Sequence, residues 1–154
     1  MRPPAIKPII SLRLQRPFLA PRETVFRAWT EPEALRRWFR VAEGYSTPIA
    51  EVDLRVGGRY RLGMRPPDGS PVLIVGGIYR EISPPEKLVF TWRWETAEAG
   101  EPETIVTVEF VEHGGNTEVV LRHEGFTNEA QREQHAQGWQ GCLEGLAQAL
   151  HQPE

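Results

Sequence analysis

The chain has 154 residues, a length typical of one domain, and its 40% hydrophobic and 25% charged residues give an ordinary globular composition. The single cysteine, Cys142, excludes an internal disulfide, and no Cys/His spacing predicts a metal site. No apolar run approaches the roughly 18 residues of a membrane span. No stretch of signal-peptide type opens the chain, so a cytoplasmic location is expected.

Charge is distributed unevenly along the chain. Residues 1–80 contain 14 Lys/Arg and 7 Asp/Glu, whereas residues 81–154 contain 4 and 14. Mutual neutralisation of the two halves in one compact fold explains this pattern. A nucleic-acid surface would instead require basic and aromatic residues interleaved on one exposed face. The basic residues that come nearest are expected on the solvent face of a strand pair, so we exclude nucleic acid as a partner: Arg55, Arg59, Arg61 and Arg65.

The chain is predicted to begin with a loose proline-rich tail, residues 1–8, and to continue as a single domain over residues 9–151. Residues 10–18 alternate apolar and polar side chains, which predicts a half-buried strand.

Two short helices are predicted next. The first starts at Pro21, and the second opens at Thr30 or Glu31, with Pro32 in a first turn that tolerates proline.

A run of strands separated by turn residues follows the two helices. The glycine pair before Asn116 is typical of a tight hairpin connection. Residues 98–102 are expected to form a polar loop. Sequential strands at this spacing indicate an antiparallel meander. The predicted strands cover residues 49–55, 59–64, 71–82, 87–95, 104–112 and 117–124.

The last segment changes from strand to helix periodicity. Asn128 can cap a helix that runs to about His151, with apolar residues recurring at intervals of three and four. The unusual glycines Gly138, Gly141 and Gly145 either are tolerated, allow close packing against the sheet, or leave room beside a cavity. The predicted fold class is α+β. A curved antiparallel sheet wraps around the long C-terminal helix, with two short helices after the first strand.

Several motifs resemble one known family over nearly the whole chain, from about residue 10 to residue 150. They are ETVFRAWTEPEALRRWF (23–39), GGRYRL (57–62), GGIYREISPPEKLVFTWRWE (76–95), TEVVLRHEGF (117–126) and GWQGCLEGLAQAL (138–150). Together they resemble the activator of heat-shock protein 90 ATPase homologue-like family, within the START/Bet-v-1-like (SRPBCC) superfamily of helix-grip folds. The resemblance implies a mostly apolar cavity between sheet and C-terminal helix. It implies no single activity, because the superfamily includes lipid carriers, cyclases, resistance proteins and co-chaperone domains.

Strand parity and helix face predict which side chains line such a cavity, although the same aromatic residues could simply fill a core. Tyr60, Tyr79 and His123 would supply hydrogen bonds, because buried polar tips need partners. Trp38 and Phe39 would plug the mouth. The full predicted set is Trp38, Phe39, Tyr60, Leu62, Met64, Tyr79, Phe90, Trp92, Trp94, Val108, Phe110, Leu121, His123, Trp139 and Leu143.

No catalytic constellation is predicted. His123 is the best general acid/base candidate, because its ordinary pKa lies near neutrality, but a core histidine with satisfied hydrogen bonds explains it more simply. His135 could approach His123 from the helix. No metal-binding HExxH spacing, phosphate loop or dinucleotide fingerprint occurs in the sequence, so neither a metal nor a cofactor is expected.

Three functions remain open from sequence. We expect binding of a small hydrophobic or aromatic molecule, lipid-, polyketide- or flavonoid-like, in an internal cavity. The alternative is a co-chaperone-like domain that regulates a heat-shock protein 90 type ATPase, with a chaperone partner and a role in stress response. The eukaryotic activators carry a further N-terminal domain that this sequence does not resemble. A cyclase or hydrolase acting on a cavity-bound substrate is the third possibility. The oligomeric state is open.

Overall fold

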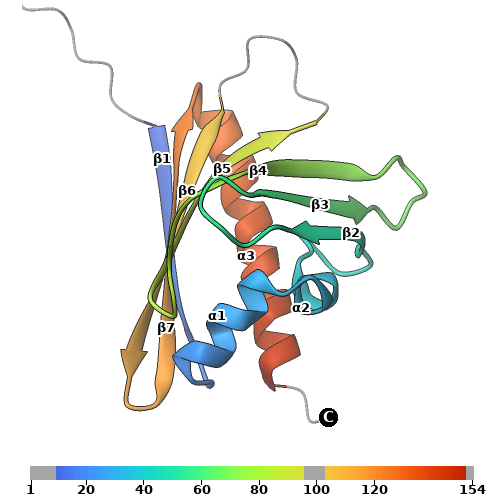
Figure 1. Ribbon diagram of the computed structural model, residues 1–154. Coiled ribbons are helices and arrows are strands. Elements are labelled where there is room, and N and C mark those ends of the chain that lie inside the picture. The colour runs from blue at the N-terminus through green and yellow to red at the C-terminus, as the bar shows by residue number, and fades with distance from the viewer. Residues whose placement is uncertain (1–9, 96–102, 152–154) are drawn as a thin grey trace, which may run out of the picture.

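A seven-stranded antiparallel sheet with the order β1-β7-β6-β5-β4-β3-β2 is the frame of the computed structural model (Figure 1). The structure describes residues 10–95 and 103–151, so the predicted tail at 1–8 and the predicted loop at 98–102 lie outside the described residues. The elements are β1 (Ile10–Phe18), α1 (Arg22–Thr30), α2 (Pro32–Trp38), β2 (Ser46–Val52), β3 (Arg59–Arg65), β4 (Leu73–Ser83), β5 (Lys87–Trp94), β6 (Thr104–His113), β7 (Asn116–Phe126) and α3 (Glu129–His151).

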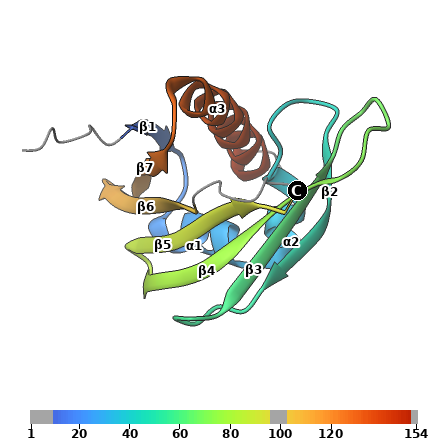
Figure 2. The ribbon, with the colours of Figure 1, turned by 90° about the horizontal axis from the view of Figure 1, so that it is seen from above.

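The sheet curves and stays open. Figure 2 shows the strands following an arc from β1 to β2, with α3 across its open side. The short helices α1 and α2 lie on the same concave side, at one end of the sheet (Figure 1). The α+β helix-grip fold is therefore confirmed. No helix among the described residues is long and apolar enough to cross a bilayer.

The element boundaries agree with the predictions within two residues except at β2. The predicted strand at 49–55 is displaced toward the C-terminus, because the chain leaves β2 after Val52 and turns. This turn lets the Gly57 N–H donate to the Tyr79 carbonyl of β4 at 2.8 Å, and Gly57 has a φ of 85° that favours glycine. At the other end, Asn128 caps α3 as predicted, with its Oδ1 accepting from the Gln131 N–H at 2.8 Å.

Ion pairs join the basic and acidic halves of the chain. Arg16 of β1 contacts Glu144 of α3 at 2.8 Å, and Arg61 of β3 contacts Glu95 at 2.6 Å. Both pairs are at least one-third exposed, so each contributes little to the free energy of unfolding. They do show how the uneven charge of the sequence is balanced in the fold.

The helix glycines allow α3 to approach the chain that follows α2. A Cβ at Gly141 would lie 1.7 Å from the Val41 carbonyl oxygen, and one at Gly145 would lie 2.5 Å from the Trp38 carbonyl oxygen. The predicted close packing is therefore present, but its partner is the segment 38–41 and not the sheet. Gly138 differs, because a Cβ there would meet only the Val41 side chain, with the Cγ1 3.3 Å away.

This difference makes a matched pair of substitutions informative. Gly141→Ala should lower the free energy of unfolding by roughly 1–3 kcal/mol, because the clash with a backbone oxygen outweighs the gain in helix propensity. Gly138→Ala should be neutral or stabilising by up to about 1 kcal/mol, because the Val41 side chain can yield. Urea unfolding of both variants measures the difference. Equal stability of the two variants would contradict the packing described for Gly141.

Candidate functional site

An open pocket of about 180 Å³ lies between α3, the inner face of the sheet and the chain after α2. Trp92 and Trp94 are two residues apart on β5, so both side chains lie on the same face of the sheet and line the pocket. From α3 it receives residues spaced by three and four positions, which form one stripe of the helix. The pocket is lined by Phe39, Val41, Met64, Trp92, Trp94, Gln134, His135, Gly138, Trp139 and Cys142. We call it the outer pocket.

A second, smaller space lies on the other side of the same aromatic rings. Its volume is about 20 Å³, close to what one water molecule occupies. The Tyr60 hydroxyl donates to the Thr91 carbonyl at 2.5 Å, and burial raises the pKa of both Tyr60 and Tyr79, so the two phenols stay neutral. The lining residues are Trp29, Leu35, Phe39, Val52, Tyr60, Leu62, Tyr79, Phe90, Trp92 and Trp139. We call it the inner cavity.

Three aromatic rings line both spaces and separate them. The ring centroids of Trp92 and Trp139 are 5.0 Å apart, and Phe39 lies 6.3 Å from Trp92 and 6.1 Å from Trp139. These rings are in mutual contact, so they form a partition between the outer pocket and the inner cavity.

Two histidines accept hydrogen bonds from two of the tryptophans. Trp139 Nε1–H donates to His123 Nδ1 at 3.0 Å, and Trp94 Nε1–H donates to His135 Nε2 at 3.0 Å. The remaining ring nitrogens then carry the protons. His123 Nε2–H donates to Thr104 Oγ1 at 2.7 Å, and His135 Nδ1–H donates to the Gln131 carbonyl at 2.8 Å.

Both histidines are held neutral. Burial, with a smaller contribution from the nearby His135, lowers the pKa of His123 to about 2. Burial also lowers the pKa of His135, although its hydrogen bond to the Gln131 carbonyl acts in the opposite direction. Burial raises the pKa of the Cys142 thiol to about 12, so this pocket residue remains a thiol at neutral pH.

The structure brings many of the predicted site residues together around the two spaces. The outer pocket receives Met64 and Trp94, and the inner cavity receives Tyr60, Leu62, Tyr79 and Phe90. Phe39, Trp92 and Trp139 form the partition between them.

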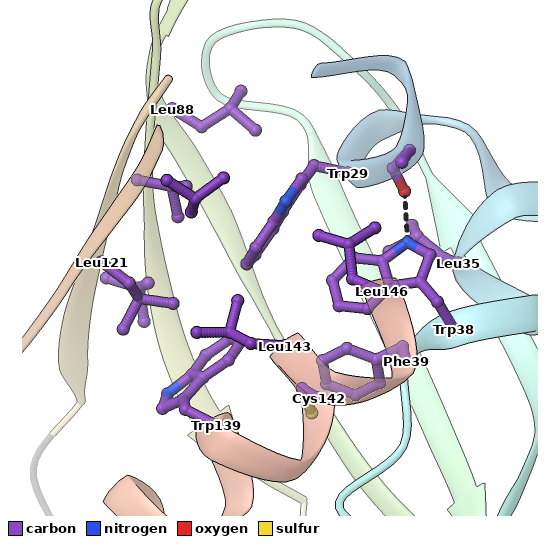
Figure 3. Packing of buried hydrophobic residues seen from close by; sticks show 14 of the residues in the cluster. Trp29, Leu35, Trp38, Phe39, Leu88, Leu121, Trp139, Cys142, Leu143 and Leu146 are labelled. Carbon is purple, nitrogen blue, oxygen red and sulfur yellow. Dashed lines mark hydrogen bonds between the residues drawn. The ribbon is translucent and has the colours of Figure 1, made fainter. Parts of the chain in front are cut away.

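The other predicted residues line neither space. Trp38 donates its indole N–H to the Ala28 carbonyl at 2.6 Å (Figure 3). Phe110 packs edge-on against Phe26 of α1, with centroids 5.4 Å apart. The helices after β1 pack against this end of the sheet, so Trp38 and Phe110 belong to the packed core. All six predicted residues that line neither space are buried: Trp38, Val108, Phe110, Leu121, His123 and Leu143.

Sequence reasoning missed several lining residues. Val41 lies outside any helix or strand, so no periodicity could identify it. His135 and Cys142 belong to the same helical stripe as Trp139, and that spacing was a usable signal. Gly138 lines the outer pocket, which agrees with the alternative that a helix glycine leaves room beside a cavity. Within residues 10–95 and 103–151, no three His, Cys, Asp or Glu side chains gather closely enough to hold a metal ion.

Comparisons with known proteins identify relatives over most of the chain. The family model described as Activator of Hsp90 ATPase homolog 1-like protein matches residues 19–151. Protein CV1439 from Chromobacterium violaceum is 30% identical with a TM-score of 0.82, covering 93% of this chain and 98% of that chain. The AHSA1-like protein from Aeromonas hydrophila is 26% identical with a TM-score of 0.76, covering 94% of this chain and 99% of that chain. No curated protein matches significantly.

The burial of His123 predicts how the free energy of unfolding depends on pH. The pKa of His123 is about 2 in the fold and about 6.5 in the unfolded chain, which therefore binds the extra proton. The stabilisation is fully present above pH 6.5 and is lost as the pH falls below this value. Between pH 8 and pH 5, His123 alone should account for a loss of about 2 kcal/mol.

Urea unfolding at several pH values tests this expectation. His123→Gln should reduce the loss between pH 8 and pH 5, because an amide does not titrate, while the contribution of His135, whose pKa burial also lowers, remains. His113→Gln, at an exposed hairpin position, is the matched control and should retain the wild-type slope. An unchanged slope in His123→Gln would show that other groups bind the proton.

Proposed function

The chain belongs to the family of Activator of Hsp90 ATPase homolog 1-like proteins, and we propose that it binds a small aromatic molecule in the outer pocket. The family and its fold support a domain of ligand-binding or co-chaperone type. The single observation that carries our proposal is the pocket itself, an open space of about 180 Å³ with four Phe and Trp side chains among its ten lining residues. An aromatic ligand would remove these rings from water, which favours binding.

The volume limits the size of the ligand. An apolar cavity of about 150 Å³ accommodates benzene, whereas sites for drug-sized molecules usually measure about 300–1,000 Å³. A molecule of one ring with small substituents therefore fits the outer pocket with the partition closed. A flavonoid-, polyketide- or lipid-like molecule would need the partition of Phe39, Trp92 and Trp139 to open.

Catalysis through His123 has less support than binding. A general base needs a free nitrogen lone pair, and the Nδ1 of His123 already accepts the Trp139 N–H. The Nε2 proton is donated to Thr104, and the ring lines neither cavity. A cyclase or hydrolase reaction would therefore have to use other groups.

Regulation of a heat-shock protein 90 type ATPase is the second candidate function, and the family description favours it. Such a function would use the protein surface, whereas ligand binding uses the outer pocket. The two are separable by NMR, because a chaperone domain would shift amide signals of exposed residues and a small aromatic ligand would shift the indole signals of Trp92, Trp94 and Trp139.

Filling the outer pocket tests the proposed function. In Gly138→Leu, the added side chain should occupy the space beside Trp139 and weaken the binding of toluene at least roughly tenfold, because the ligand loses its contact area. Indole-detected NMR titration measures the dissociation constant, and urea unfolding checks that the variant remains folded.

Gln137→Leu is the matched control. It places the same side chain at an exposed position next to Gly138, outside the lining of the outer pocket. It should bind toluene as the wild type does. Absence of a saturable shift in the wild-type protein for any one-ring compound would overturn the proposed function.

A further inference from the structure

The five tryptophans differ in how their indole N–H groups are satisfied. Trp38, Trp94 and Trp139 donate to the Ala28 carbonyl, His135 and His123, respectively. Trp29 and Trp92 are both 5% exposed, and their Nε1 atoms have no hydrogen-bond partner among the described residues. Most buried polar groups in proteins are paired, so two unpaired donors in one small core need an explanation.

Both unpaired donors belong to rings that line the cavities. Trp92 lines the outer pocket and the inner cavity, and Trp29 lines the inner cavity, although neighbouring atoms cover both Nε1 atoms themselves. Trp139 lies between them, with its ring centroid 5.0 Å from that of Trp92 and 5.9 Å from that of Trp29. The third unpaired atom, Arg22 Nε, belongs to a guanidinium that contacts Glu112 at 3.6 Å. The two unpaired donors that have no other polar contact therefore both belong to tryptophans that line the cavities.

We propose that the ligand of the outer pocket carries a neutral hydrogen-bond acceptor, such as the carbonyl oxygen of an aryl ketone, which accepts the Trp92 Nε1–H once the Trp92 ring has turned toward the pocket. This inference rests on the proposed function and specifies its ligand class. A pure hydrocarbon would leave the buried N–H unpaired, whereas a ketone oxygen would satisfy it. In a longer ligand that opens the partition, the Trp29 N–H is available for a second acceptor.

The charge of the lining selects a neutral acceptor. Neither space has a Lys or Arg among its lining residues in the described part of the chain. A carboxylate bound there would lose its hydration without forming an ion pair. The free-energy cost of this desolvation exceeds the gain from one hydrogen bond with an indole N–H. Aryl ketones, aldehydes and ethers therefore fit the pocket better than aromatic acids.

A matched ligand pair tests the inference. Acetophenone and ethylbenzene have nearly the same shape and differ by the carbonyl oxygen. Their dissociation constants are measured for the wild type, Trp92→Phe and Trp94→Phe. In Trp92→Phe, the affinity of acetophenone relative to ethylbenzene should fall roughly tenfold, because the hydrogen bond is lost. Trp94→Phe can weaken both ligands but should leave their ratio unchanged, because the Trp94 N–H is already donated to His135.

NMR of the wild-type protein gives an independent answer if Trp92→Phe does not fold. Acetophenone should move the Trp92 indole proton downfield, and ethylbenzene should not. An unchanged affinity ratio in Trp92→Phe, or a downfield shift confined to another tryptophan, would overturn the inference and leave the proposed function standing. Failure of both ligands to bind would overturn the proposed function and the inference with it. Tighter binding of benzoate than of acetophenone would refute the neutral acceptor.

Discussion

The close approach of α3 to the chain that follows α2 is the constraint on which the rest of the structure depends. At Gly141 the helix lies so near the Val41 carbonyl that no side chain fits. This contact sets the height of α3 above the sheet and holds Phe39 and Val41 against the helical stripe that carries Trp139. The outer pocket exists because, one turn earlier, Gly138 also lacks a side chain but meets no backbone. The glycines that cost helix stability thus define both a tight contact and the adjoining space.

A chain of hydrogen bonds connects the helix to the sheet at the same level. Trp139 donates to His123, His123 donates to Thr104, and the Thr104 hydroxyl donates to the Trp92 carbonyl at 3.1 Å. It spans α3, β7, β6 and β5, and every polar group in it is satisfied. The neutral state of His123 is part of this arrangement, because a protonated ring could not accept the Trp139 N–H. The chain therefore holds the Trp139 ring through its indole N–H and residue Trp92 through its backbone carbonyl, while the Trp92 indole N–H takes no part in it.

Much of the fold could be predicted from sequence because the signals were local. Alternation along residues 10–18 and the Asn128 cap depend on neighbouring residues alone, and both elements occur where they were predicted. The end of β2 was misplaced because it depends on a contact with Tyr79, far along the chain. Likewise, the identity of the partner for Gly141 and Gly145 could not be predicted, since the segment 38–41 has no periodic pattern. Features that depend on neighbouring residues could be predicted from the sequence, whereas contacts between segments far apart in the sequence could not.

The extent of the cavity was not predictable for a related reason. Strand parity correctly identified which side chains face inward, but it treats all inward positions alike. Phe110 and Tyr60 are both buried, yet Phe110 packs against Phe26 of α1, whereas Tyr60 borders the inner cavity. The contacts of α1 with the sheet fill one part of the inner face, and the side chains of Phe39, Trp92 and Trp139 lie between the outer pocket and the inner cavity. Neither arrangement follows from the order of strands and helices, so chains with this fold can differ in the size of the space between sheet and helix.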